Sequence, residues 1–155
     1  MLILLDIDGV MVPTTSWKPT EILSDGFANF SERAITNLQT IIYNTGASIL
    51  LTTSHKSRYS NSEWEEIFKR RGITTNINTL EPNKDNLNRK EEILRWHTKT
   101  SIAESFVIID DDKSLNGLPN HIKDKAIITS GTVGLTFEQA QSAIDILKKE
   151  KYAIA

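Results

Sequence analysis

The chain contains no cysteine. A disulfide, a thiolate nucleophile and a cysteine-ligated zinc site are therefore excluded. Apolar runs are short: the first is broken by Asp6 and follows no basic leader, so we expect neither a signal peptide nor a membrane span. A cytoplasmic location is the default expectation. The net charge of −2 disfavours a generally basic nucleic-acid binder, although it permits a local basic patch.

Proline and glycine are also scarce, with 4 and 7 residues, and no repeat or low-complexity linker divides the chain. A length of 155 residues is enough for one domain with a substantial core. We therefore expect residues 1–155 to form a single domain.

Predicted strands and helices alternate along the chain. Strands are expected at 2–7, 48–52, 73–78, 106–110 and 126–129, and helices at 29–44, 62–71, 88–98 and 136–149. Helix 29–44 has apolar residues at helical spacing, with Ser31 near its start and Gly46 after its end. This alternation predicts an α/β fold with a doubly wound, mostly parallel, Rossmann-like sheet.

Two aspartates end the first apolar run. The segment MLILLDIDGV predicts a buried parallel strand followed by Asp6 and Asp8. Ligands of open α/β sheets bind beyond the carboxyl ends of such strands. Two like charges at this spacing usually need a cation or a shared proton. The alternative is an acidic turn without function, because Asp-Gly is a common turn sequence.

A second acidic cluster repeats this pattern. The segment FVIIDDD (106–112) predicts another buried strand, which delivers three aspartates, Asp110 to Asp112, at its carboxyl end. If the two strands are neighbours, four or five carboxylates converge. Such hard oxygen ligands suit Mg²⁺, and without a cation so many charges would be costly to keep ionised together. We therefore expect Mg²⁺ at this edge of the sheet, with Asp112 in a loop.

Hydroxyl and basic side chains complete the pattern. Thr52, Thr53 and Ser54 follow the strand in SILLTTSHK, where hydroxyls can donate to phosphoryl oxygens beside backbone N–H groups. Arg89 and Lys90 open a predicted helix before FVIIDDD, where a cation can lie over the carboxylates. Each feature also has an ordinary explanation, since serine and threonine are common in caps and loops and helix cations are commonly solvated.

The order of these parts resembles the haloacid dehalogenase superfamily of phosphotransferases: DxDGV, a hydroxyl after the second strand, a basic residue, then DD. The resemblance covers nearly the whole chain. LLDIDGVMVP, IFKRRGI, EEILRWH and TSGTVGLTFEQAQSAIDIL are similar to the small uncapped branch found as phosphatase domains in "Swiss Army Knife" RNA-repair proteins. The chain departs from that branch after the second-strand hydroxyls, where His55 and Lys56 replace an aromatic-basic pair.

The resemblance implies a Mg²⁺-dependent phosphohydrolase. It makes Asp6 the nucleophile that forms an aspartyl-phosphate, and Asp8 the general acid and then the base. The implied Mg²⁺ ligands are Asp6, the main-chain carbonyl of Asp8, and Asp110 or Asp111. The implied contacts to the equatorial phosphoryl oxygens come from Thr52 and from Arg89 or Lys90.

Short intervals between the motifs leave no room for a large cap domain. Asp8 and Thr52 are 44 positions apart, and Thr52 and Arg89 are 37 positions apart. An open site favours a bulky phosphorylated substrate, such as a polynucleotide end, over a small metabolite. No obligate protein partner is evident.

Candidate substrate contacts are Thr53, Ser54, Lys56 and, as a ring that stacks on a base, Trp17. Basic residues at positions 56, 58 and 69–71 form either a phosphate-tracking strip or, more ordinarily, a solvated face. His55 either touches substrate or is merely exposed. Trp64 and Trp96 share helices with apolar residues and are expected in the core.

Two other functions remain open. One is a small-molecule or nucleotide phosphatase with the same fold. The other is a non-catalytic, metal-binding regulatory module, and the presence of both Asp6 and Asp8 speaks against it because an idle site needs neither.

Overall fold

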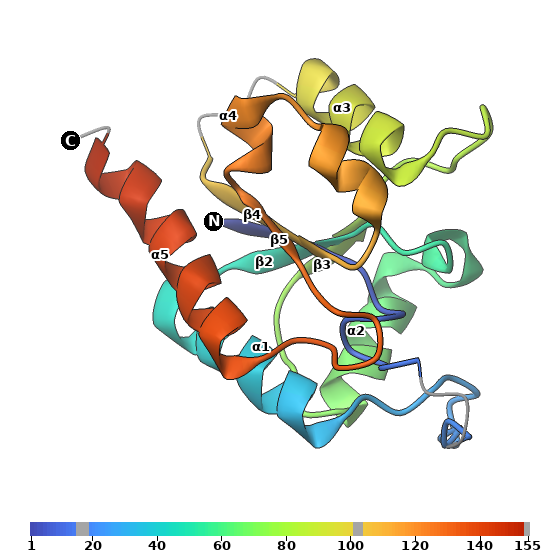
Figure 1. The fold of residues 1–155 in the computed structure, drawn as a ribbon. Coiled ribbons are helices and arrows are strands. Elements are labelled where there is room, and N and C mark those ends of the chain that lie inside the picture. Colours follow the sequence, from blue (N-terminus) through green and yellow to red (C-terminus); the bar gives the residue numbers. More distant parts are fainter. Residues whose placement is uncertain (15–18, 101–103, 154–155) are drawn as a thin grey trace.

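The computed structural model describes residues 1–14, 19–100 and 104–153, and a parallel sheet forms its centre (Figure 1). The strands are β1 (Leu2–Leu5), β2 (Ser48–Leu51), β3 (Ile77–Thr79), β4 (Phe106–Asp110) and β5 (Ala126–Ile128). They lie in the order β3-β2-β1-β4-β5, and every neighbouring pair is parallel.

Helices cover both faces of this sheet. The α-helices are α1 (Glu32–Thr45), α2 (Asn61–Arg70), α3 (Arg89–Lys99), α4 (Asn120–Lys123) and α5 (Phe137–Ala153). The 3₁₀ turns η1 (Lys56–Arg58) and η2 (Lys113–Gly117) follow β2 and β4. Helices α1, α2 and α5 pack on one face and α3 and α4 on the other (Figure 1). The predicted α/β fold with a doubly wound parallel sheet is confirmed.

Alternating side chains of each strand supply two cores. In β1, Ile3 and Leu5 face the core shared with α1, α2 and α5, whereas Leu4 faces the core shared with α3, η2 and α4. All three side chains are fully buried. Burial on both faces explains why the strands appear in the sequence as continuous apolar runs.

Local capping signals set the helix ends. The Ser31 side chain accepts a hydrogen bond from the Ala34 N–H, so α1 begins at Glu32 rather than at the predicted residue 29. Gly46 ends α1 in the left-handed conformation with a φ of 69°. Helices α2 and α3 both begin with reciprocal capping boxes.

Some predicted elements have other limits. Strand β1 ends at Leu5 instead of residue 7, because the N–H groups of residues 10–12 bond back to the Ile7 carbonyl in a tight turn. A strand was predicted over 73–78, whereas β3 begins at Ile77 and ends at Thr79, one residue beyond that range. The short elements η1, η2 and α4 were not predicted, since they contain too few residues for a helical period to emerge.

The carboxyl edge of the sheet is open. In the ranges that the structure describes, no large cap domain covers it, as the motif intervals predicted. Among the same residues, no helix has both the length and the apolar character needed to cross a membrane.

Candidate active site

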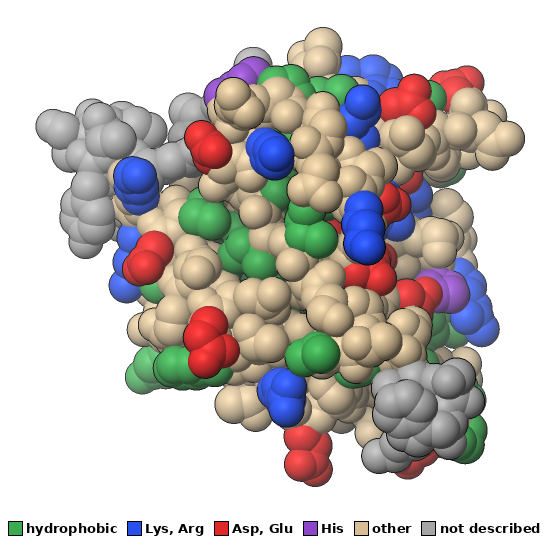
Figure 2. Space-filling view, viewed as in Figure 1, with side chains coloured by type: hydrophobic (Ala, Val, Ile, Leu, Met, Phe, Trp, Pro, Cys, Tyr) green, Lys and Arg blue, Asp and Glu red, His purple; other side chains and the backbone are tan. Residues whose placement is uncertain are grey.

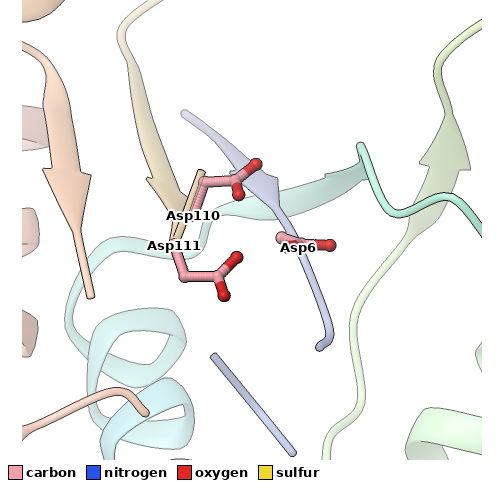
Figure 3. Close-up of side chains that lie close together, drawn as sticks. All are labelled: Asp6, Asp110 and Asp111. Atoms are coloured by element: carbon pink, nitrogen blue, oxygen red, sulfur yellow. The ribbon is translucent and has the colours of Figure 1, made fainter. Parts of the chain in front are cut away.

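Neighbouring strands bring the two acidic motifs together. Strands β1 and β4 pair in parallel with Leu5 opposite Ile109, so Asp6 and Asp110 leave the sheet side by side. The Asp6 N–H continues the ladder by donating to the Ile109 carbonyl at 3.0 Å. One carboxylate oxygen from each of Asp6, Asp110 and Asp111 lies within 4.8 Å of the other two (Figure 3). This Asp triad can hold a metal ion.

A glycine makes room for the third carboxylate. Gly9 has a φ of 82°, and a Cβ atom at this position would collide with the Asp111 carboxylate. A Cβ on Gly131 would lie 3.0 Å from the same Asp111 Oδ2 atom. The turn after β1 therefore approaches Asp111 with bare backbone, which only glycine permits.

Two other acidic side chains lie outside the triad. The Asp8 side chain is 52% exposed, and its Oδ2 lies 2.8 Å from Nε2 of His55. The Asp112 side chain caps η2 by accepting from the Ser114 N–H at 2.8 Å. Four or five carboxylates were predicted to converge, but only three do so among the described residues. Tight turns follow both strands and direct the Asp8 and Asp112 side chains away from the triad.

A buried arginine lies against the triad. Arg89 begins α3, and its Nη1 forms an ion pair with Asp110 and lies 3.5 Å from Asp6 Oδ1. Thr52 Oγ1 is 3.4 Å from both Arg89 Nη1 and Asp110 Oδ2. The structure thus brings Arg89 to the carboxylates, whereas the Lys90 side chain lies beside Gly117 of η2.

The triad fits a divalent cation electrostatically. Burial, followed by the neighbouring Asp110 carboxylate, raises the pKa of Asp6 to about 8, although Arg89 acts in the opposite direction. Burial and Asp110 also raise the pKa of Asp111. The protein alone therefore favours a proton among these groups at neutral pH, and a bound cation would take the place of that proton. An all-carboxylate set is typical of hard cations such as Mg²⁺.

A model of the family described as "HAD domain in Swiss Army Knife RNA repair proteins" matches residues 2–140. The chain belongs to this family. The match contains every residue of the triad as well as Thr52 and Arg89. Membership places the chain in the haloacid dehalogenase hydrolase superfamily, which indicates a phosphohydrolase-type function and the use of a divalent metal. A search of curated proteins finds no match.

The candidate substrate contacts of this family member lie in different surroundings. Thr53 is buried, and its Oγ1 accepts from the His55 N–H at 3.2 Å. Ser54 is exposed beside the site. Lys56 was expected to contact substrate, but it is only 5% exposed and its Nζ lies 2.8 Å from Glu92 Oε2. Trp17 lies outside the described residues.

The expected solvated basic face is also only partly present. Arg71, like Lys56, is buried, and its Nη1 lies 2.6 Å from Asp25 Oδ2. Arg58 is exposed, with its guanidinium 5.8 Å from the centroid of the Phe27 ring and 5.5 Å from that of Tyr59. Two of the five basic residues are therefore buried in ion pairs and are not part of a solvated face. Sequence reasoning missed their acidic partners because those partners are distant in the chain.

The tryptophans of the two helices behave as expected. Trp64 is fully buried in the larger core, which confirms its predicted place. Trp96 is partly buried and packs against the smaller core, 5.2 Å from Phe106 between ring centroids.

Sequence reasoning did not single out Glu92 or the contact between His55 and Asp8. Glu91 and Glu92 are both in the first turn of α3. The Glu91 side chain lies at the surface and accepts a hydrogen bond from the Asn88 N–H, whereas Glu92 is buried and only 5% exposed. The capping-box pattern could have assigned Glu91 to the surface. The remaining glutamate, three residues after Arg89, would then have been the candidate partner of that arginine.

Proposed function

We propose that this protein is a Mg²⁺-dependent phosphomonoesterase that acts through an aspartyl-phosphate on Asp6. The observation that carries the proposal is the Asp triad beside Arg89 at the open carboxyl edge of the sheet. Ligands of open α/β sheets bind at this edge. Membership of a haloacid dehalogenase family supports the reaction class.

In the first step, a carboxylate oxygen of Asp6 attacks phosphorus and the bond from phosphorus to the ester oxygen breaks. Asp8 donates its proton to the departing oxygen. The half-exposed position of Asp8, outside the triad, suits a group that meets the leaving group. Arg89 and Thr52, whose Nη1 and Oγ1 atoms are 3.4 Å apart beside the triad, would bind the equatorial phosphoryl oxygens.

In the second step, Asp8 takes a proton from water as the water oxygen attacks phosphorus. The bond from phosphorus to Asp6 breaks, so that inorganic phosphate is released and the free Asp6 carboxylate is regenerated. The Asp triad and the Asp8 main-chain carbonyl would hold Mg²⁺, which supplies positive charge next to the carboxylates and the phosphoryl oxygens. Uncatalysed phosphate-monoester hydrolysis is slow enough to require up to ~10²¹-fold acceleration, which no single group supplies.

For the substrate, we propose a phosphorylated polynucleotide end. The open edge of the sheet and the RNA-repair description of the family support it. The small-molecule phosphatase gains support from the burial of Lys56 and Arg71, because a phosphate-tracking strip of basic residues would then lack two of its five members.

Turnover of an aryl phosphate, measured with Mg²⁺ and with excess EDTA, tests the reaction. We expect phosphate release only with the metal, and loss of turnover in Asp6→Asn, whose amide is nearly isosteric but cannot form the acyl phosphate. Asp145→Asn, an exposed change on α5, is the matched control and should keep wild-type activity. Turnover by Asp6→Asn within a few-fold of wild type would exclude Asp6 as nucleophile. Mg²⁺ binding without any turnover would favour the non-catalytic module.

A further inference from the structure

We propose that Lys56 and Glu92 are positioning residues that hold the Arg89 guanidinium against the catalytic carboxylates. The inference rests on the proposed function, because it concerns how Arg89 is oriented for that reaction. Neither Lys56 nor Glu92 contacts substrate in this arrangement.

Charges alternate along a buried row that ends at the site. Lys56 Nζ lies 2.8 Å from Glu92 Oε2, and Glu92 Oε1 lies 3.7 Å from Arg89 Nε. Arg89 Nη1 then meets Asp110 and lies 3.5 Å from Asp6 Oδ1. The side chains of Lys56 and Glu92 are each 5% exposed, and that of Arg89 is 11% exposed. Little solvent therefore screens the row.

Glu92 acts on the edge of the guanidinium that does not face the triad. Arg89 and Glu92 are three residues apart on α3 and share one face of the helix. At 3.7 Å the Nε–Oε1 contact is an ion pair rather than a hydrogen bond, so its effect is electrostatic. With Nε drawn to Glu92 and Nη1 to Asp110, the planar guanidinium is held from both sides, which limits its rotation.

Lys56 holds Glu92 in place from the side opposite Arg89. It follows Thr52 by four positions and begins η1, and its carbonyl accepts from Trp64 Nε1 at 3.1 Å. The Lys56–Glu92 pair thus ties η1 to the helix that begins with Arg89. Without Lys56, the buried Glu92 carboxylate would compete with Asp110 and Asp6 for Arg89.

Stability alone gives a weaker account of this pair. Replacing a buried ion pair by apolar residues of similar volume is often neutral or stabilising. A pair kept at such a desolvation cost, next to an arginine of the site, is better explained by the orientation that it imposes.

The test compares Glu92→Gln with wild type by two readouts. The first is kcat and KM for an aryl phosphate with Mg²⁺, where we expect kcat to fall about 10- to 100-fold, as for other lost supports of site residues. The second is the NMR signal of the Arg89 Nε–H group, identified by its loss in Arg89→Lys. We expect this signal to shift and broaden in Glu92→Gln.

Glu81→Gln is the matched control. Glu81 precedes α3, and its Oε1 lies 2.9 Å from Nε of Arg95 on that helix; the Glu81 side chain is 47% exposed. This variant should keep wild-type kcat and leave the Arg89 signal unchanged. The double variant Lys56→Met/Glu92→Met removes both charges with little change in volume, and it decides the matter if Glu92→Gln does not fold. Its kcat should also fall, and its Arg89 signal should also broaden.

A kcat within about twofold of wild type, with an unchanged Arg89 signal, in either variant would overturn the positioning role. A fall in the unfolding temperature with both readouts unchanged would do the same and leave the pair structural. Failure of the proposed function is distinguishable: wild type would then lack turnover, while the Arg89 signal would still report whether Glu92 holds the guanidinium.

Discussion

Gly9 is the single residue on which the space for the Asp triad most directly depends. Its φ is 82°, and a Cβ there would collide with the Asp111 carboxylate. We expect Gly9→Ala to weaken Mg²⁺ binding at least tenfold, because Asp111 must move, a loss typical of disturbed metal sites. Isothermal titration with Mg²⁺ measures this.

Gly26→Ala is the control for backbone strain. Gly26 has the same φ of 82°, but a Cβ there would meet nothing within 4 Å. Both variants should lose about 1–2 kcal/mol of unfolding free energy, as expected for a residue forced into the left-handed region. Only Gly9→Ala should lose metal affinity. Equal Mg²⁺ affinity in the two variants would show that Gly9 does not make room for Asp111.

Asp8 is separated from the triad, and this position has a kinetic consequence. Its carboxylate meets His55 at 2.8 Å instead of the other aspartates. As the general acid, Asp8 protonates only leaving groups that need a proton. We therefore expect Asp8→Asn to reduce kcat about 10²–10⁴-fold for alkyl phosphates and far less for aryl phosphates. Steady-state rates on the two substrates measure this, and equal losses on both would exclude the role.

At the scale of elements, α2 and the segment before α1 are joined by one buried arginine. Arg71 donates to Asp25 and to the carbonyls of Phe27, Ala28 and Ile67. The hydrogen bonds from Arg71 hold the pKa of Asp25 below its ordinary value. Folding is thus favoured by the charged form of Asp25.

Asp25→Asn should lower the unfolding free energy at pH 7 by about 1.5–3 kcal/mol, the range for hydrogen bonds to charged groups. Because the pKa is lowered in the folded state, this contribution is complete above the unfolded pKa of about 4 and is lost as pH falls through the lower folded value. Urea unfolding at several pH values measures the difference between variant and wild type. Asp145→Asn should show no such difference, and a gap that widens below pH 4 would contradict the assignment.

At the scale of the whole molecule, the distribution of charge bears on whether a polynucleotide can bind. Figure 2 shows acidic and basic side chains interspersed over the face in view, and the net charge is −2. Among the expected basic contacts, Arg58 is exposed and lies over Phe27, whose ring is 5.6 Å from that of His55. Polynucleotide binding should therefore depend on few charges.

A phosphorylated oligonucleotide should show a higher kcat/KM than the matching mononucleotide at low salt. Arg58→Gln should reduce the slope of log(kcat/KM) against log[salt] by about 0.7, the value for one phosphate contact to a single strand. Lys149→Gln, an exposed change on α5 outside the candidate basic strip, should leave the slope unchanged. Equal efficiency on both substrates at low salt would favour the small-molecule phosphatase.

The sequence by itself determined the sheet, the open edge and the main acidic pair. Apolar runs that end at Asp6 and Asp110 predict buried parallel strands, and the structure established that these two are neighbours. Ser31 and Gly46 mark the ends of α1. These signals are local, because burial on both faces leaves a strand apolar throughout and capping needs only a few residues. The short motif intervals likewise excluded a large cap.

Tertiary structure alone decided which of two adjacent residues serves the site. Neighbours on a helix point about 100° apart, so only packing selects Arg89 over Lys90 for the carboxylates. The turn after β4 places Asp111 in the triad and Asp112 in a cap. Lys56 is buried where it meets Glu92, 36 positions later in the chain. Such contacts are set by the approach of distant segments, which no local sequence pattern encodes.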